Sequence, residues 1–155
     1  MNFDEILPRL LVGSCPESFE DLELLKRSEG VSAILSLQTD GDLRWLGLEL
    51  GVLEDSCARL GLLFRRVPVT DMDSQDLRLR LADCVRALDE LLAAGHKVYL
   101  HCTAGAGRSP GVAIAWLVWR AGWNLRQAHA WVTQRRPSSP DLEAIRDAIS
   151  ERPEL

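Results

Sequence analysis

Cys102 and Arg108 are the two residues in this sequence best suited to covalent chemistry. A cysteine thiolate is a strong nucleophile, and an arginine guanidinium holds two oxygens of a phosphate group in a bidentate fork. The C-x5-R spacing is weak evidence by itself, because four cysteines and many arginines produce it by chance. The segment around the pair, "HCTAGAGRS", is what makes the interpretation specific.

This segment has the composition of an anion-binding loop. A short apolar run and His101 precede the cysteine, Gly105 and Gly107 lie inside the loop, and Ser109-Pro110 begins a predicted helix. Glycines let the backbone curl so that successive N–H groups point inward and form a nest for a tetrahedral dianion. The helix behind adds unpaired N–H groups and the positive end of its dipole. The same field favours a thiolate, so we expect the anion cradle and the nucleophile to be one site.

Asp71 is the predicted proton donor for this chemistry. It follows the predicted strand that precedes the cysteine-bearing strand, and parallel strands end at the same edge of a sheet. Asp73 is the alternative, but with Asp76 three residues on it has the pattern of a helix N-cap.

Alternation of apolar and amphipathic segments predicts an α/β fold, a single domain with a central, mostly parallel sheet flanked by helices. Strands are predicted at residues 9–13, 31–38, 62–69 and 97–102. Helices are predicted at residues 18–30 (with Ser18 as N-cap), 75–94, 109–122, 124–136 (with Asn124 as N-cap) and 140–150. The segment 39–53, which holds Trp45, is expected to be irregular.

Composition narrows the classes of partner. The 155 residues are 46% hydrophobic and 26% charged, as in one folded domain spanning 1–155. A net charge of -5 without a basic run argues against nucleic acid, and no segment approaches the roughly 20 apolar residues of a membrane span. The N-terminus lacks the pattern of a signal peptide, so a cytoplasmic location is expected. The four cysteines lack metal-ligand spacing, and neither a metal nor a cofactor is expected.

The loop resembles the H-C-x5-R-[ST] signature of the cysteine-dependent phosphatases. Its form "CTAGAGR" is similar to that of glucan phosphatases of the dual-specificity class, laforin and the plant starch-excess enzymes. The resemblance extends to "LLVGSC", "LQTDGDLRWLG", "DMDSQDLRLRL" and "PDLEAIRDA", and so covers nearly the whole chain. It implies a dual-specificity phosphatase-like fold.

The resemblance also implies roles for individual residues. Cys102 would attack phosphorus, Asp71 would protonate the leaving alcohol or phenol, and water would hydrolyse the phosphocysteine. Ser109 would donate a hydrogen bond to the sulfur, and His101 would orient the loop rather than act as a base. The implied phosphate cradle consists of Thr103, Ala104, Gly105, Ala106, Gly107 and Arg108.

A phosphorylated glucan or oligosaccharide is the substrate that the resemblance implies. Trp45 matches a position at which the family stacks an aromatic ring on glucose. Met72 occupies a position that is usually aromatic in the plant enzymes, and no carbohydrate-binding module is expected. A protein phosphatase acting on phosphotyrosine and phosphoserine or phosphothreonine is the alternative, because the catalytic loop is common to both. The remaining tryptophans are interpreted as packing, and Arg135 and Arg136 as basic residues that suit a helix C-terminus.

Overall fold

The computed structural model describes residues 1–155 and contains one five-stranded sheet. Only β1 is antiparallel to its neighbour, and β5 lies at the centre, so the predicted α/β fold with a mostly parallel sheet is confirmed. In spatial order the strands are β1 (Phe3–Leu7), β2 (Leu10–Gly13), β5 (Val98–His101), β3 (Ala33–Ser36) and β4 (Leu63–Arg66).

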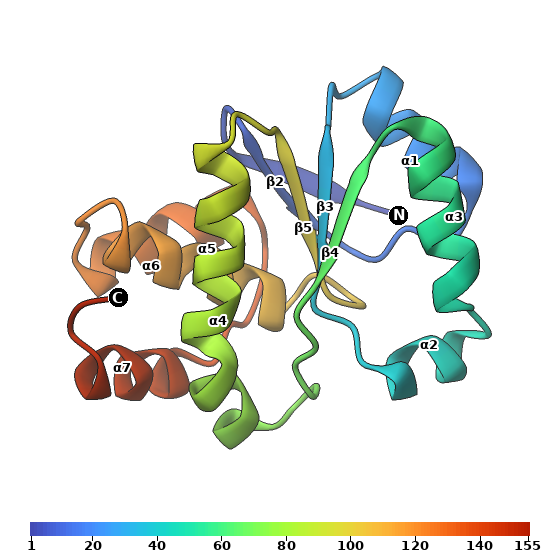
Figure 1. Ribbon diagram of the computed structural model, residues 1–155. Coiled ribbons are helices and arrows are strands. Elements are labelled where there is room, and N and C mark those ends of the chain that lie inside the picture. Colours follow the sequence, from blue (N-terminus) through green and yellow to red (C-terminus); the bar gives the residue numbers. More distant parts are fainter.

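Helices cover both faces of the sheet and make three layers (Figure 1). One layer holds α1 (Phe19–Arg27), α2 (Asp40–Leu46) and α3 (Leu50–Leu60). The other holds α4 (Ser74–Ala93), α5 (Arg108–Trp119), α6 (Leu125–Arg135) and α7 (Leu142–Glu151). None of these helices combines the length and the apolar character needed to cross a bilayer.

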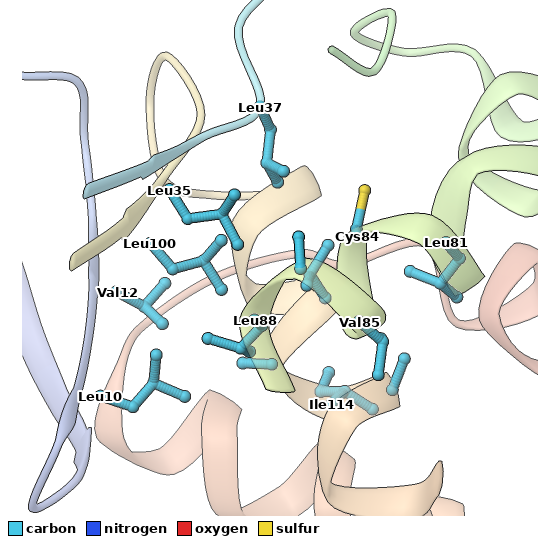
Figure 2. Close-up of a cluster of buried hydrophobic side chains, with 14 of the residues drawn as sticks. Leu10, Val12, Leu35, Leu37, Leu81, Cys84, Val85, Leu88, Leu100 and Ile114 are labelled. Atoms are coloured by element: carbon cyan, nitrogen blue, oxygen red, sulfur yellow. The ribbon is translucent and has the colours of Figure 1, made fainter. Parts of the chain in front are cut away.

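The main hydrophobic core lies between the sheet and the layer of α4 to α7. Figure 2 shows Leu88 of α4 and Ile114 of α5 in the same cluster as Leu100 of β5. Tyr99 belongs to a smaller core that also contains residues of α1 and α3. Because successive strand residues point to opposite faces, burial on both sides explains why Val98, Tyr99 and Leu100 of β5 are all large hydrophobic residues.

Local capping signals predict most helix starts correctly. Ser18, Asp73 and Asn124 each accept a hydrogen bond from the amide three residues later, as an N-cap does. The last helix begins slightly later than predicted, because Asp141 rather than Pro140 is its cap.

The prediction that residues 39–53 are irregular is wrong, because this segment forms α2 and the start of α3. Thr39 and Asp42 form a reciprocal capping box at the start of α2, in which each side chain bonds the other's backbone N–H. Gly47 ends α2 in the left-handed conformation, at a φ of 69°. Trp45 therefore lies on a short helix and not in a loop. Strand β1 was also not predicted.

Candidate active site

Cys102 directly follows the central strand β5, and the loop 102–107 connects it to α5. The cysteine is 2% exposed, at the floor of the site. The loops that follow β3 and β4 leave the same edge of the sheet, since these strands run parallel to β5. This edge therefore gathers residues from segments far apart in the sequence.

Four consecutive carbonyl groups of the loop, those of residues 103–106, accept hydrogen bonds from outside it. The donor–acceptor pairs are the Cys15 amide to Thr103 (2.9 Å), Arg136 Nη2 to Ala104 (3.2 Å), Arg136 Nε to Gly105 (2.6 Å) and the Ser139 amide to Ala106 (2.8 Å). In a planar trans peptide the N–H of the next residue points opposite to the carbonyl. The amides of residues 104–107 therefore face the inside of the loop.

None of the amides of residues 103–107 donates a hydrogen bond to a protein atom. Helix α5 begins immediately behind them, and its N-cap, Gly107, provides no side-chain cap. The first N–H groups of α5 add their partial positive charge to the same place. Together these donors form a concave site suited to a tetrahedral oxyanion.

The loop depends on a close contact between Gly105 and Gly13 of β2. Gly105 has a φ of +70°, which side chains rarely allow, and a Cβ there would lie 2.5 Å from the carbonyl carbon of Gly13. Neither the backbone conformation nor the space tolerates a larger residue.

Arg108 is 4% exposed, and its guanidinium is fixed along one edge. Its Nη1 donates to Asp42 Oδ2 at 2.6 Å and to the Val69 carbonyl at 2.8 Å. Its Nε lies 3.2 Å from Asp71 Oδ1, but the angle is not that of a hydrogen bond and this N–H has no partner. Nε and Nη2 are therefore the atoms that remain for a ligand.

The carboxyl group of Asp42 is charged beside Arg108. Burial raises its pKa, but the hydrogen bond from Arg108 and those from Thr39 outweigh this effect and bring the pKa below the usual range. Asp42 therefore neutralises part of the charge of Arg108 and fixes the direction of its guanidinium.

Asp71 lies on the loop after β4, and its side chain is 55% exposed. Met72, the next residue, has a φ of 56°, and it is the only residue other than glycine with a positive φ. Its amide donates to Asp71 Oδ1 at 3.1 Å. Backbone in this region is strained for a residue with a side chain, and such strain is concentrated at functional sites.

Two further polar groups contact the cysteine. Ser109 Oγ lies 3.3 Å from Cys102 Sγ. His101 Nδ1 lies 2.9 Å from the Cys102 carbonyl oxygen, and because a carbonyl only accepts, Nδ1 carries the proton. Burial is the main reason that the pKa of His101 is lowered to about 4, so its ring is neutral at pH 7.

The two large side chains that were predicted to contact substrate are both exposed. Trp45 on α2 is 84% exposed, and Met72 is 98% exposed. A cavity of about 130 Å³ runs from the Asp71 loop to Gly107 and Arg108. No cluster of His, Cys, Asp or Glu side chains has a metal-binding arrangement.

Comparison with known proteins assigns the family. Residues 51–149 match the family described as dual specificity phosphatase, catalytic domain. The chain belongs to the dual specificity phosphatases. It is 37% identical over 153 residues to the amyloplastic phosphoglucan phosphatase DSP4 of Castanea sativa, over 97% of this chain and 40% of that protein.

It is also 33% identical over 148 residues to laforin of Mus musculus, over 89% of this chain and 45% of laforin. The crystal structure of Tk-PTP in its active form superposes with a TM-score of 0.77 at 26% identity, over 96% of this chain and 94% of that one. The predicted resemblance is thus confirmed for the family. The chain spans less than half the length of DSP4 and of laforin.

Two residues of the candidate active site were not among those predicted. Asp42 was placed in an irregular segment, although its position three residues after Thr39 is the signal for a capping box. Arg136 was interpreted as a helix-terminal charge, but it is buried and its guanidinium bonds the catalytic loop. No local sequence pattern distinguishes Arg136 from its neighbour Arg135.

Proposed function

We propose that this phosphatase removes phosphate from glucans through a phosphocysteine intermediate. The observation that supports the chemistry is the row of four outward-held carbonyls, which leaves the amides of the loop after Cys102 facing inward. Nε and Nη2 of Arg108, which follows the same loop, are two further N–H donors without a hydrogen bond to the protein. Such donors stabilise the charge that develops on the equatorial oxygens of a phosphoryl group in transfer.

In the first step the Cys102 thiolate attacks phosphorus, and the bond from phosphorus to the sugar oxygen breaks. The phosphate oxygens bind Nε and Nη2 of Arg108, whose Nη1 stays bonded to Asp42. Asp71 then exchanges its contact with Arg108 for the leaving oxygen and gives that oxygen a proton.

In the second step a water molecule attacks the phosphocysteine, and the sulfur–phosphorus bond breaks. Asp71, now ionised, accepts the proton of the water. The sulfur leaves as a thiolate that accepts a hydrogen bond from Ser109, which already lies 3.3 Å away. His101, neutral and bonded to the Cys102 carbonyl, positions the loop and takes no part in proton transfer.

The glucan assignment rests on the relatives and on Trp45. The two relatives described above that are more than 30% identical to this chain are a phosphoglucan phosphatase and laforin. Trp45 and Asp42 lie one helical turn apart on α2, so the exposed indole is tied to the helix that holds Arg108. An exposed ring at this place is suited to the apolar face of a sugar next to the phosphate.

The decisive experiment compares phosphate release from phosphorylated amylopectin with release from phosphotyrosine and phosphothreonine peptides. Each rate is normalised to p-nitrophenyl phosphate, and the Cys102→Ser protein provides the blank. We expect the normalised rate to be highest for the glucan. A higher rate for the peptides would replace the glucan by a phosphoprotein as substrate.

Trp45→Ala tests whether the exposed Trp45 ring contributes to glucan binding. We expect KM for phosphorylated amylopectin to rise roughly fivefold, about 1 kcal/mol at 1.4 kcal/mol per tenfold, with hydrolysis of p-nitrophenyl phosphate unchanged. Val52→Ala is the matched control, because Val52 is an exposed apolar residue on α3. If the two substitutions change KM equally, Trp45 does not contribute to substrate binding.

A further inference from the structure

A second cavity, of about 480 Å³, lies against the outer surface of α6 and away from the catalytic loop. Two tryptophans and two glutamines dominate its lining. Its residues are Gly122, Trp123, Gln127, Ala130, Trp131 and Gln134. Four of them follow the i, i+3, i+4, i+7 spacing of one helix face, although this face is neither apolar enough for a core nor charged like ordinary surface.

The two indoles form a rigid corner. Their ring centroids lie 5.2 Å apart with an angle of 83° between the planes. Trp131 is fixed by a hydrogen bond from its Nε1 to the Ile6 carbonyl at 2.9 Å and by the guanidinium of Arg135, 3.0 Å from its ring centroid. Rings held in this way bind a ligand with little loss of conformational entropy.

The polar groups of this cavity are free for a ligand. Nε1 of Trp123 donates no hydrogen bond to the protein, whereas those of Trp116, Trp119 and Trp131 all do. The side-chain amides of Gln127 and Gln134 also make no hydrogen bond within the protein. Each amide offers both a donor and an acceptor at once, which matches a pair of neighbouring hydroxyl groups.

The lining contains no charged side chain, and the nearby guanidinium of Arg135 is engaged by Trp131. A phosphate or a carboxylate would find no charged partner among the lining residues, and a purely apolar ligand would leave both amides unpaired. The lining instead fits a neutral molecule with flat C–H faces and many hydroxyl groups.

We propose that this cavity is a second carbohydrate site, which binds an unphosphorylated part of a glucan. The choice of glucan among carbohydrates rests on the function proposed above. Helix α6 joins the two sites, because Arg136 at its end bonds Ala104 and Gly105 of the catalytic loop. Gln127 lies about 14 Å along the helix from Arg136, at 1.5 Å per residue.

The experiment titrates maltoheptaose, which carries no phosphate, into the Cys102→Ser protein and follows the indole N–H signals by NMR. The five tryptophans give five signals, assigned by substitution. We expect the Trp123 signal to shift, and to shift in the Trp45→Ala background as well. An unmoved Trp123 signal overturns the second site.

Kinetics provide an independent readout. In Trp123→Ala and in the more conservative Gln127→Glu we expect KM for phosphorylated amylopectin to rise roughly fivefold, about 1 kcal/mol at 1.4 kcal/mol per tenfold. Hydrolysis of p-nitrophenyl phosphate should not change, which shows that the variants fold. Arg126→Gln, an exposed substitution on α6 outside the cavity lining, is the matched control.

The two proposals fail in different ways. If the wild-type protein releases no phosphate from glucan but maltoheptaose still shifts Trp123, the proposed function is wrong and the carbohydrate site is supported. If phosphate is released while KM is the same in both variants, the proposed function stands and the second site is refuted.

Discussion

The most demanding prediction concerns Arg136, which holds the catalytic loop. Its planar guanidinium bonds two loop carbonyls on one side, and on the other it bonds Asp4 at 3.0 Å and Asn2 at 2.7 Å. Arg136→Lys keeps the positive charge but replaces the fork by one compact ammonium group. This group reaches one loop carbonyl at most, so one peptide is no longer held with its N–H inward.

The expected loss of activity in Arg136→Lys follows from the hydrogen bonds that are lost. A hydrogen bond to a charged group contributes about 1.5–3 kcal/mol, and removing one donor from an oxyanion site costs about 2.7–4 kcal/mol of transition-state stabilisation. The peptide unit that loses its hydrogen bond to residue 136 still adopts its former orientation part of the time. We therefore expect a loss of about 2–3 kcal/mol of transition-state stabilisation. This corresponds to a decrease in kcat/KM of roughly 30- to 150-fold.

The assay is kcat/KM for p-nitrophenyl phosphate together with the inhibition constant of inorganic phosphate, which should weaken in parallel. Urea unfolding at the assay temperature confirms that the variant is folded. Arg135→Lys is the matched control, since Arg135 stacks on Trp131 and touches no atom of the loop. If kcat/KM of Arg136→Lys is within threefold of that of the control and inhibition by phosphate is unchanged, Arg136 does not anchor the loop.

Three other predictions concern the acid, the glycine contact and the histidine. Asp71→Asn should lower turnover of poor leaving groups such as sugar alcohols roughly 100-fold and turnover of activated aryl phosphates little, and an equal loss for both would remove Asp71 from the role of acid. Gly105→Ala should lower the free energy of unfolding by about 3 kcal/mol, because its Cβ meets Gly13 and φ is positive, so an unchanged urea midpoint would contradict this packing. His101 has a pKa of about 4 when folded and about 6.5 when unfolded, so the unfolded chain binds the proton first as the pH falls. Stability should therefore decrease by up to roughly 3 kcal/mol between pH 6.5 and 4, and His101→Gln should flatten that slope in urea titrations.

Features set by neighbouring residues were predicted from the sequence. The caps at Ser18, Asp73 and Asn124 follow from hydrogen bonds over three residues, and Cys102 and Arg108 are joined by one short loop. The apolar residues of β5 agree with its place at the centre of the sheet, where both of its faces are buried. Each of these signals is local, so no tertiary information was needed.

Features set by distant pairs were not predicted. Asp42 and Arg108 are separated by 66 positions, and Arg136 and Gly105 by 31. Helix α2 was missed because it is short and contains Gly41, so its helix propensity is low and its capping box decides the outcome. Strand β1 is an edge strand whose only partner is β2, and pairing of this kind leaves little trace in composition.

The contacts of Arg136 with Asn2 and Asp4 join positions 134 and 132 residues apart. Bringing such remote segments together is slow, because the entropy lost on closing so large a loop is recovered only when the contacts form. A partly folded molecule whose central helices are already packed would still lack the contacts of Arg136 with Asn2 and Asp4. Recovery of catalysis during refolding should therefore lag behind recovery of helical circular dichroism, and enzymatic activity would report on the last stage of assembly.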